Sequence, residues 1–288
     1  QGEKVDASPQ YTIDVIDDQA PAVRFSKPGR DSQASPVEEV FLEARADDGG
    51  CIRLQDRVAL VTGAGSGIGA EICRAFPREG ALVAVTDSRQ EAAEKVATEI
   101  RKERGRAQAW RMDVRARSEV ETTADAVEEA LGPLAIWVNN AGADLLTGEA
   151  AKLSFDDKLQ RLYEVDVRST LLLSRLVGQR MVAAGGGTIL NIGWDQAERG
   201  MEGDSGELFS AAKSAIMGFT RSLSLSLAPT VRVNCIAPGW IRTKWGEGAS
   251  DVWQERVLRE TPLKRWGVPE DIAAVARFLV SREASYIT

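Results

Sequence analysis

Short apolar runs alternate with amphipathic stretches along most of this chain, from residue 53 onward. The runs that begin at Val58, Ala81 and Leu134 are almost continuously apolar, as expected of strands buried on both faces of a parallel sheet. Strands that alternate with helices are typical of a sheet covered by helices on both sides. The sequence therefore predicts an α/β fold, a doubly wound parallel sheet in three α/β/α layers, with strands at residues 58–62, 81–85, 107–112, 134–138, 187–191 and 231–236 and helices at residues 91–104, 118–131, 155–183 and 209–227.

Residues 1–52 follow a different pattern, with acidic pairs, scattered prolines and few large apolar side chains. Much of this extension is expected to be irregular. Alternation at Tyr11, Ile13 and Val15 predicts a short strand, and residues 36–43 predict a short helix. We therefore expect an N-terminal extension at residues 1–52, whose role the sequence does not indicate, and one large domain at residues 53–288.

Composition removes several classes of function. The formal net charge of −7 argues against a nucleic-acid-binding surface, and the absence of histidine together with three widely spaced cysteines argues against a metal site or a disulfide framework. Apolar runs stay below the roughly 18 residues that a membrane span needs, and no secretory leader pattern opens the chain. A cytoplasmic protein without membrane or nucleic-acid partners is expected.

A glycine-rich turn follows the first predicted strand and leads into a helical pattern. Gly63, Gly67 and Gly69 permit a tight turn in which backbone N–H groups approach a pyrophosphate at the positive end of the helix. A turn without ligand is the alternative, but the strand–turn–helix context favours a dinucleotide site. Asp87 ends the next strand, where a carboxylate accepts hydrogen bonds from the adenosine ribose and repels the additional phosphate of NADP; a solvated loop carboxylate is the alternative. NAD is therefore favoured over NADP, although Arg89 partly offsets the repulsion.

Further motifs follow this turn in a fixed order: Asp113-Val114, Asn139-Asn140-Ala141-Gly142, a Pro238-Gly239 turn that leads to Thr243, and the loop at residues 265–271. Over residues 53–288 they resemble the short-chain dehydrogenase/reductases of the 3-oxoacyl-carrier-protein reductase type. The asparagine–glycine segment and the Pro-Gly turn each have a plain turn without ligand as their alternative. The resemblance implies a Rossmann domain whose cofactor site comprises Gly63, Ser66, Gly67, Ile68, Gly69, Asp87, Asp113, Val114, Asn140, Ala141, Gly142, Lys213, Pro238, Gly239 and Thr243.

The catalytic tetrad that the resemblance implies is degenerate. In the family, a tyrosine donates the proton to the carbonyl oxygen and a lysine four residues later lowers the pKa of that tyrosine; here Phe209 precedes Lys213 by this interval. The position of the family serine corresponds to Trp194, or to Gln196 by the commonest interval, and Asp166 stands in place of the helical asparagine. Only Lys213 is retained, with an exposed helix lysine as its alternative, and ordinary core or interface aromatics are the alternative for Trp194 and Phe209.

Loss of a positioned general acid typically costs a factor of 10² to 10⁴ in rate, so the usual route of carbonyl reduction is not expected. The first hypothesis is an atypical oxidoreductase that transfers hydride between NAD(H) and a carbonyl or alcohol with another proton donor. The second is a non-catalytic NAD(H)-binding sensor or partner subunit. Candidate replacements for the tyrosine are Tyr163, Asp166, Asp195, Asp204, Ser205, Glu207, Ser210 and Lys213.

The resemblance also implies oligomers. In the family, the helices expected at residues 155–183 and 209–227 form subunit interfaces, so we expect a homo-oligomer or a pairing with an active homologue. Two departures accompany this expectation: Pro77 should end or kink the helix after the glycine turn, and the chain stops at residue 288, where family members continue with a glycine and a last strand, which suggests a fragment. We therefore expect the sheet to lack that strand.

Overall fold

The computed structural model describes residues 12–15, 23–26, 53–146 and 148–288. The chain divides into two compact units, Gln1–Cys51 and Ile52–Thr288. In the first unit, strand β1 (Thr12–Val15) pairs in antiparallel fashion with β2 (Val23–Ser26). The alternation at the start of the chain predicts β1 but not β2, and the helix expected at residues 36–43 lies outside the described residues.

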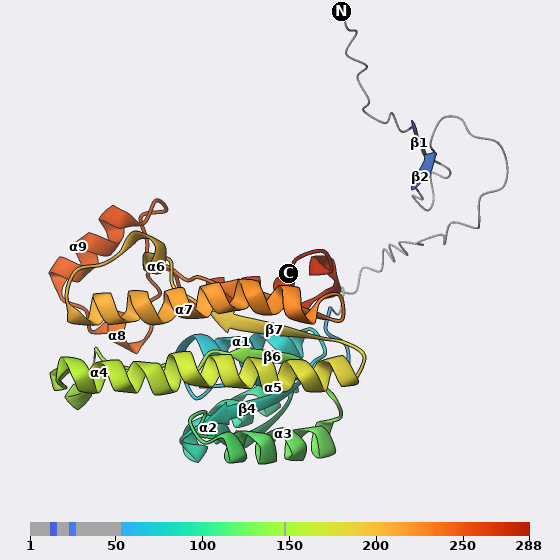
Figure 1. The fold of residues 1–288 in the computed structure, drawn as a ribbon, viewed down its shortest axis with the longest axis horizontal. Coiled ribbons are helices and arrows are strands. Elements are labelled where there is room, and N and C mark those ends of the chain that lie inside the picture. The colour runs from blue at the N-terminus through green and yellow to red at the C-terminus, as the bar shows by residue number, and fades with distance from the viewer. Residues whose placement is uncertain (1–11, 16–22, 27–52, 147) are drawn as a thin grey trace, which may run out of the picture. The chain divides into compact units, whose positions relative to one another are not determined.

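The second unit is built on one parallel sheet of six strands in the order β5-β4-β3-β6-β7-β8 (Figure 1). This order reverses between β3 and β6, so the chain moves outward from the centre of the sheet in both directions, as in a doubly wound fold. The predicted fold class is confirmed, and each predicted strand matches one of β3 (Val58–Val61), β4 (Leu82–Asp87), β5 (Arg106–Arg111), β6 (Leu134–Asn139), β7 (Gly187–Ile192) and β8 (Val231–Ile236).

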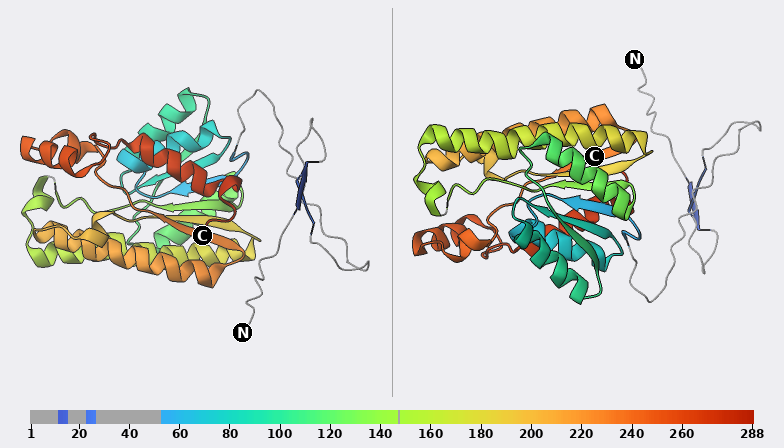
Figure 2. Two further views of the ribbon diagram at one scale, coloured as in Figure 1. Left: turned by 90° about the horizontal axis from the view of Figure 1, so that it is seen from above. Right: turned by 90° about the horizontal axis from the view of Figure 1, so that it is seen from below.

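Helices cover both faces of this sheet (Figure 2). Most buried apolar side chains form one large cluster on each side, and these two clusters share no residue because successive side chains of a strand point to opposite faces. One cluster contains side chains of α1 (Gly67–Arg78), α2 (Gln90–Lys102) and α10 (Pro269–Val280), and the other those of α3 (Arg117–Leu131), α5 (Ser169–Ala183) and α7 (Asp204–Leu227). A third, smaller cluster contains Leu145, Leu162 and Leu208.

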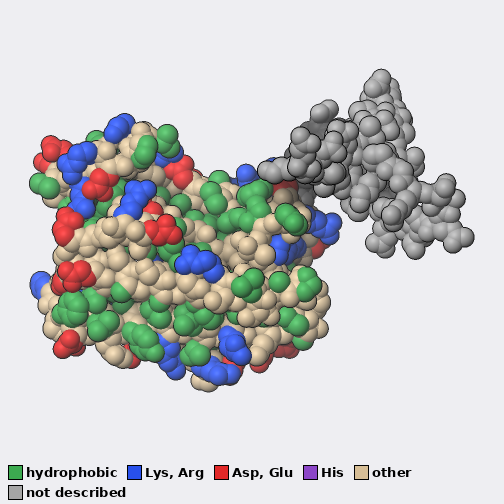
Figure 3. Space-filling view, turned by 45° about the horizontal axis from the view of Figure 1, so that its top comes forward, with side chains coloured by type: hydrophobic (Ala, Val, Ile, Leu, Met, Phe, Trp, Pro, Cys, Tyr) green, Lys and Arg blue, Asp and Glu red, His purple; other side chains and the backbone are tan. Residues whose placement is uncertain are grey.

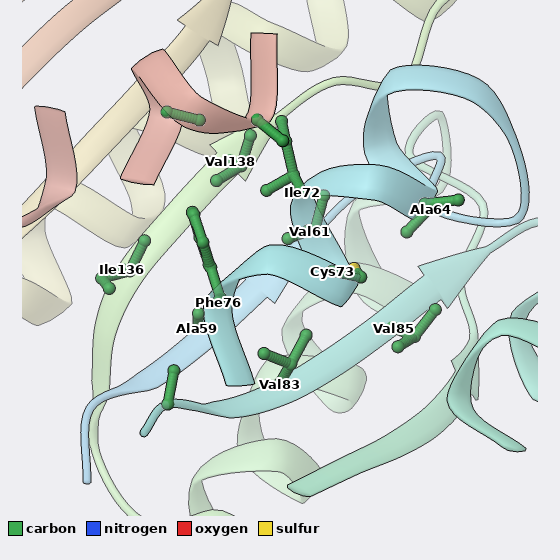
Figure 4. Close-up of a cluster of buried hydrophobic side chains, with 14 of the residues drawn as sticks. Ala59, Val61, Ala64, Ile72, Cys73, Phe76, Val83, Val85, Ile136 and Val138 are labelled. Carbon is green, nitrogen blue, oxygen red and sulfur yellow. The ribbon is translucent and has the colours of Figure 1, made fainter. Parts of the chain in front are cut away.

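Helix α1 directs its apolar face at the central strands. In Figure 4, Ile72, Cys73 and Phe76 lie among the apolar side chains of β3, β4 and β6. The helix ends at Arg78, one residue beyond Pro77, in agreement with the early end that the proline predicts. This packing holds the glycine turn, which precedes α1, against the carboxyl end of β3.

Two helix predictions need correction. The stretch at residues 155–183 is not one regular helix: α4 (Phe155–Leu162) continues into a π-helical segment, η2 (Tyr163–Arg168), before α5 begins. The helix expected from residue 209 begins at Asp204, because Gly203 takes a positive φ that ends the preceding loop, and acidic side chains then occupy the first turn, where the helix dipole favours them. The remaining short elements are η1 (Gly148–Lys152), α6 (Gln196–Arg199), α8 (Lys244–Glu247), α9 (Asp251–Glu260) and η3 (Arg282–Ala284).

The last described residues run beside the edge strand β8. Thr288 accepts a hydrogen bond from the backbone of Val233, and the carbonyl of Ile287 accepts one from Asn234. On the face shown in Figure 3, acidic and basic side chains are interspersed. In the described part of the chain, none of the helices has the length and apolar character of a membrane span.

Candidate active site

The glycine turn fits closely against the loop after β6. Gly63 has a φ of 61°, and a Cβ at this position would lie 2.6 Å from Cα of Ala141. The Asn140 side chain donates hydrogen bonds of 3.0 Å to the carbonyls of Thr62 and Gly63. A Cβ on Gly69 would meet the carbonyl of Gly63 at 2.6 Å. Glycine is therefore required here by close backbone approach, and the turn and the loop after β6 form one surface at the carboxyl end of the sheet.

Asp87 joins this surface from the end of β4. One carboxylate oxygen accepts a hydrogen bond of 3.0 Å from the backbone of Gly65, and the other accepts one of 3.0 Å from the backbone of Arg89. The Arg89 side chain is 67% exposed and its Nε lies 3.5 Å from the same carboxylate. Asp87 thus places a negative charge beside the glycine turn, and Arg89 provides a mobile positive charge next to it.

The adjacent strand contributes Asp113 and Val114. The carboxylate of Asp113 accepts hydrogen bonds from Nε and Nη2 of Arg115, and these bonds hold the pKa of Asp113 below its usual value. Val114 is buried and follows directly. Because β5 pairs with β4, Asp113 and Asp87 come after neighbouring strand ends, as the motif order predicts.

Thr243 and the Pro238-Gly239 turn approach from the other half of the sheet. A Cβ on Gly67 would lie 3.6 Å from Cγ2 of Thr243, so the segment after β8 reaches the glycine turn. The carbonyl of Pro238 accepts a hydrogen bond of 3.1 Å from the backbone of Asp195. The segment is held by the pairing of Ile241 with Gly267.

Lys213 forms a buried ion pair with Asp166. Its Nζ lies 3.1 Å from Oδ1 of Asp166, and it donates a hydrogen bond of 3.2 Å to the carbonyl of Ile192 at the end of β7. The other oxygen of Asp166 accepts from the backbone of Ala143 at 2.8 Å. The approach of Asp166 Oδ1 is close enough for an ion pair but lacks hydrogen-bond alignment. The Lys213 side chain is 13% exposed.

Buried polar side chains form a hydrogen-bond network between β6, β7 and α7. Asn139 accepts from Nε1 of Trp137 at 2.7 Å and donates to Oδ1 of Asn191 at 2.8 Å, and Asn191 donates to Thr220 at 2.9 Å. The network ties β6 and β7 to α7, on which Lys213 lies. The sequence analysis did not predict it, although Asn139 belongs to the asparagine motif.

The aromatic side chains of Trp194 and Phe209, which the sequence analysis aligned with the family serine and tyrosine, contact each other. The rings of Trp194 and Phe209 meet edge to face, with centroids 6.2 Å apart. Trp194 also contacts Trp240 at 6.4 Å, and Trp240 contacts Trp253 at 5.5 Å. Gln196, the alternative serine position, is buried at the start of α6. Sequence reasoning missed Trp240 and Trp253, whose only signal was an unusual density of tryptophan.

The candidate replacements for the tyrosine differ in their surroundings. Asp204 forms an ion pair of 2.8 Å with the buried Lys158 and also accepts from the backbone of Ser205. Glu207 is exposed, and so is Tyr163. Asp195 is different, because burial raises the pKa of its carboxyl and its Oδ1 is buried without a hydrogen-bond partner.

Known proteins match most of the large unit in sequence and in fold. The family model described as "Enoyl-(Acyl carrier protein) reductase" matches residues 63–288. The chain is 37% identical over 242 residues to 7alpha-hydroxysteroid dehydrogenase of Escherichia coli K12, a match that covers 82% of this chain and 92% of that protein. The chain belongs to the short-chain dehydrogenase/reductase family.

A second relative and a solved structure also match most of the chain. The 3-oxoacyl-[acyl-carrier-protein] reductase of Thermotoga maritima is 30% identical over 240 residues, covering 82% of this chain and 95% of that protein. A solved structure of 7 alpha-hydroxysteroid dehydrogenase, in complex with NADH and 7-oxo glycochenodeoxycholic acid, matches with a TM-score of 0.75 and 35% identity, covering 83% of this chain and 92% of that one. Membership in this oxidoreductase family therefore rests on sequence and on fold.

Proposed function

We propose that this chain is an NAD(H)-dependent oxidoreductase that interconverts a carbonyl compound and an alcohol, with a proton donor other than the family tyrosine. The observation that carries the proposal is the continuity of the cofactor surface. Contacts connect Asp87 with the glycine turn, the turn with Ala141 and Thr243, and the loop after Ala141 with Lys213 through Asp166. A dinucleotide requires such a surface along its whole length.

The residues present suit a nicotinamide dinucleotide. The backbone N–H groups at the start of α1 lack partners inside the helix, and the helix dipole favours a pyrophosphate there. Asp87 would accept hydrogen bonds from the adenosine ribose, and Lys213 would bind the nicotinamide ribose with its ammonium group. When bound, the cofactor supplies the hydride.

The preference for NAD rests on Asp87. The residue is 8% exposed and its carboxylate is held by two backbone hydrogen bonds, so it cannot turn away from an additional ribose phosphate. Arg89 is the side chain that can oppose this preference, since it is free to swing outward. NADPH is therefore the weaker ligand in this proposal.

A second function is favoured by one observation: Trp194 and Phe209 contact each other where the orienting serine and the acidic tyrosine would act. Neither side chain is acidic enough to give a proton to a substrate oxygen, and the one polar hydrogen of the pair is the indole N–H of Trp194. If no other group replaces the serine and the tyrosine, the protein binds NAD(H) without turnover and acts as a sensor or as the partner of an active homologue.

We also propose that the chain forms a homo-oligomer. Phe155 and Leu159 lie one helical turn apart on α4, and both are largely exposed. Leu172 on α5 and Leu225 on α7 are exposed as well, the latter by 82%. Large exposed apolar side chains on neighbouring long helices are typical of protein interfaces.

The first test is a fluorescence titration of the purified protein with NADH and, separately, with NADPH. Tight NADH binding and weaker NADPH binding are expected. Binding of neither coenzyme would refute both functions, and preferred binding of NADPH would refute the role given to Asp87.

Turnover then separates catalysis from sensing. The carbonyl panel should contain 7-oxo glycochenodeoxycholic acid and a 3-oxoacyl thioester, because similar proteins bind or act on such compounds. Oxidation of NADH that depends on a carbonyl supports the oxidoreductase. A protein that binds NADH but oxidises it with no member of the panel supports the sensor or partner role.

A further inference from the structure

Buried polar atoms without partners gather at the candidate active site. Among the residues that the structure describes, three buried side-chain oxygens or nitrogens have no hydrogen-bond partner: Oδ1 of Asp166, Oδ1 of Asp195 and Oγ of Ser210. Buried polar groups in folded proteins are nearly always satisfied, so each exception calls for an explanation. Asp166 has one in its ion pair with Lys213. Asp195 does not.

Asp195 lies at the centre of the altered site. It follows Trp194 directly, and its backbone N–H donates to the carbonyl of Pro238. Its Oδ2 lies 3.6 Å from the place that a Cβ on Gly239 would take, so the carboxyl group faces the Pro-Gly turn of the cofactor surface. The aromatic contact between Trp194 and Phe209 is thus adjacent to a carboxyl group that points toward the cofactor side.

The charges around Asp195 come from two helices. Burial is the largest influence and raises the pKa of its carboxyl; Arg199 on α6 acts in the opposite direction, and Glu260 on α9 adds to the increase. The carboxylate of Glu260 accepts hydrogen bonds from Nε1 of Trp240 at 3.1 Å and from Nε of Arg256 at 2.7 Å. Gln196 approaches Oδ2 of Asp195 at only 3.5 Å. The carboxyl group therefore keeps its proton to a higher pH than an exposed aspartate, as an acid catalyst requires.

The other candidate carboxyl groups are either paired or exposed. The carboxylate of Asp204 forms an ion pair with Lys158 and accepts a hydrogen bond from the backbone of Ser205. Glu207 is exposed, and Asp166 forms an ion pair with Lys213. We propose that Asp195 is the proton donor of this oxidoreductase and takes over the role of the missing tyrosine. This inference rests on the proposed function, since it requires bound NADH and a carbonyl substrate.

The step balances without a further reactant. As hydride passes from the nicotinamide ring to the carbonyl carbon, the electron pair of the C=O π bond moves to the oxygen. That oxygen bonds to the proton of the Asp195 carboxyl group, the O–H bond of the carboxyl breaks, and alcohol, NAD⁺ and carboxylate result. Solvent returns the proton to Asp195. In the oxidation direction, the carboxylate accepts the hydroxyl proton.

The test compares Asp195→Asn, Asp195→Glu and a matched control, Glu198→Gln, which removes an exposed carboxylate from the same short helix. Two quantities are measured for each protein from pH 5 to pH 9. The first is the NADH dissociation constant. The second is the rate of NADH oxidation in a single turnover, with the carbonyl of the panel that the unmodified protein reduces best. We expect Asp195→Asn to lower the rate by about 10² to 10⁴ without changing NADH binding. Asp195→Glu should restore part of the rate, and Glu198→Gln should leave it unchanged.

The pH profile separates a proton donor from a structural role. In the reduction direction, the unmodified protein should lose rate as the pH rises through the raised pKa of Asp195, and Asp195→Asn should remove this decrease. If Asp195→Asn keeps the rate and the profile of the unmodified protein, the inference is wrong while the proposed function stands. If the unmodified protein binds NADH but reduces no carbonyl of the panel, both are overturned.

Discussion

Lys213 and Asp166 lie 3.1 Å apart, nitrogen to carboxylate oxygen, and Asp166 is completely buried. Removing one partner of a buried ion pair leaves the other charge uncompensated and costs about 3–5 kcal/mol. We therefore expect Lys213→Met to lower the free energy of unfolding by about that amount, measured by urea denaturation, and to weaken NADH binding. Asp166→Asn should cost less, because an asparagine can still accept from the backbone of Ala143. Equal losses in the two variants would contradict this reasoning.

The charge of Asp87 should decide the choice of coenzyme. Asp87→Asn keeps an acceptor for the backbone of Gly65 but removes the repulsion toward a ribose phosphate. A change of about 1.4 kcal/mol corresponds to a factor of ten, and we expect the ratio of NADPH to NADH affinity to rise by at least about this factor. Fluorescence titration measures it. As the control, Arg89→Ala in the same background should lower NADPH affinity again; an unchanged ratio in Asp87→Asn would refute the assignment.

The tight turn should not tolerate a side chain at Gly63. Gly63→Ala places a methyl group 2.6 Å from Cα of Ala141 in a backbone conformation that favours glycine. We expect it to destabilise the protein by more than about 1 kcal/mol and to abolish NADH binding. Gly218, inside α7, is the matched position, because a Cβ there meets nothing within 4 Å. Gly218→Ala should raise stability by about 0.5–1 kcal/mol, and thermal unfolding of both variants checks the contrast.

Restoring the family residues tests what the aromatic contact has replaced. Phe209→Tyr, combined with Trp194→Ser, places a hydroxyl acid four residues before Lys213 and removes the ring that contacts it. In a competent pocket, the double variant should reduce the panel of carbonyls at least about 100-fold faster than the unmodified protein. Steady-state rates with NADH provide the measurement. If the unmodified protein reduces none of these carbonyls, no gain in the double variant despite intact NADH binding would favour the sensor or partner role.

The Asp271 carboxylate at the start of α10 should stabilise the fold less at low pH. Asp271 accepts hydrogen bonds from Arg265 and from the backbone of Val268, and the bond from Arg265 lowers its pKa to about 2. Because the pKa in the folded state lies below that of the unfolded chain, about 3.9, the stabilisation is present above that value and is lost as the pH falls toward 2. Asp271→Asn should lower the free energy of unfolding by less than about 1 kcal/mol at pH 6, and this difference should shrink at pH 3. A constant difference in urea denaturation would contradict this account.

The parts of the site that sequence reasoning predicted have local signals. The glycine turn, Asp87 and the asparagine segment each follow a strand, and parallel strands bring their carboxyl ends to one edge. Three features of the site have no such signal: the contact of Trp194 with Trp240, the unpartnered oxygen of Asp195, and the ion pair of Lys158 with Asp204. The two contacts join side chains that are far apart in the sequence, and the unpartnered oxygen depends on the absence of a hydrogen-bond donor beside it. Only the folded chain shows these relationships.

The π-helical segment η2 sets how far α4 is rotated about its axis relative to α5. A π-turn holds one residue more than an α-turn, and one residue corresponds to about 100° around the helix axis. Asp166, within this segment, meets Lys213, while Lys158 on α4 meets Asp204, so both contacts with α7 depend on the phase between α4 and α5. Deleting one residue from η2 would turn α4 by roughly a quarter of a revolution. The chain could then keep the Asp166 contact or the Lys158 contact, but not both.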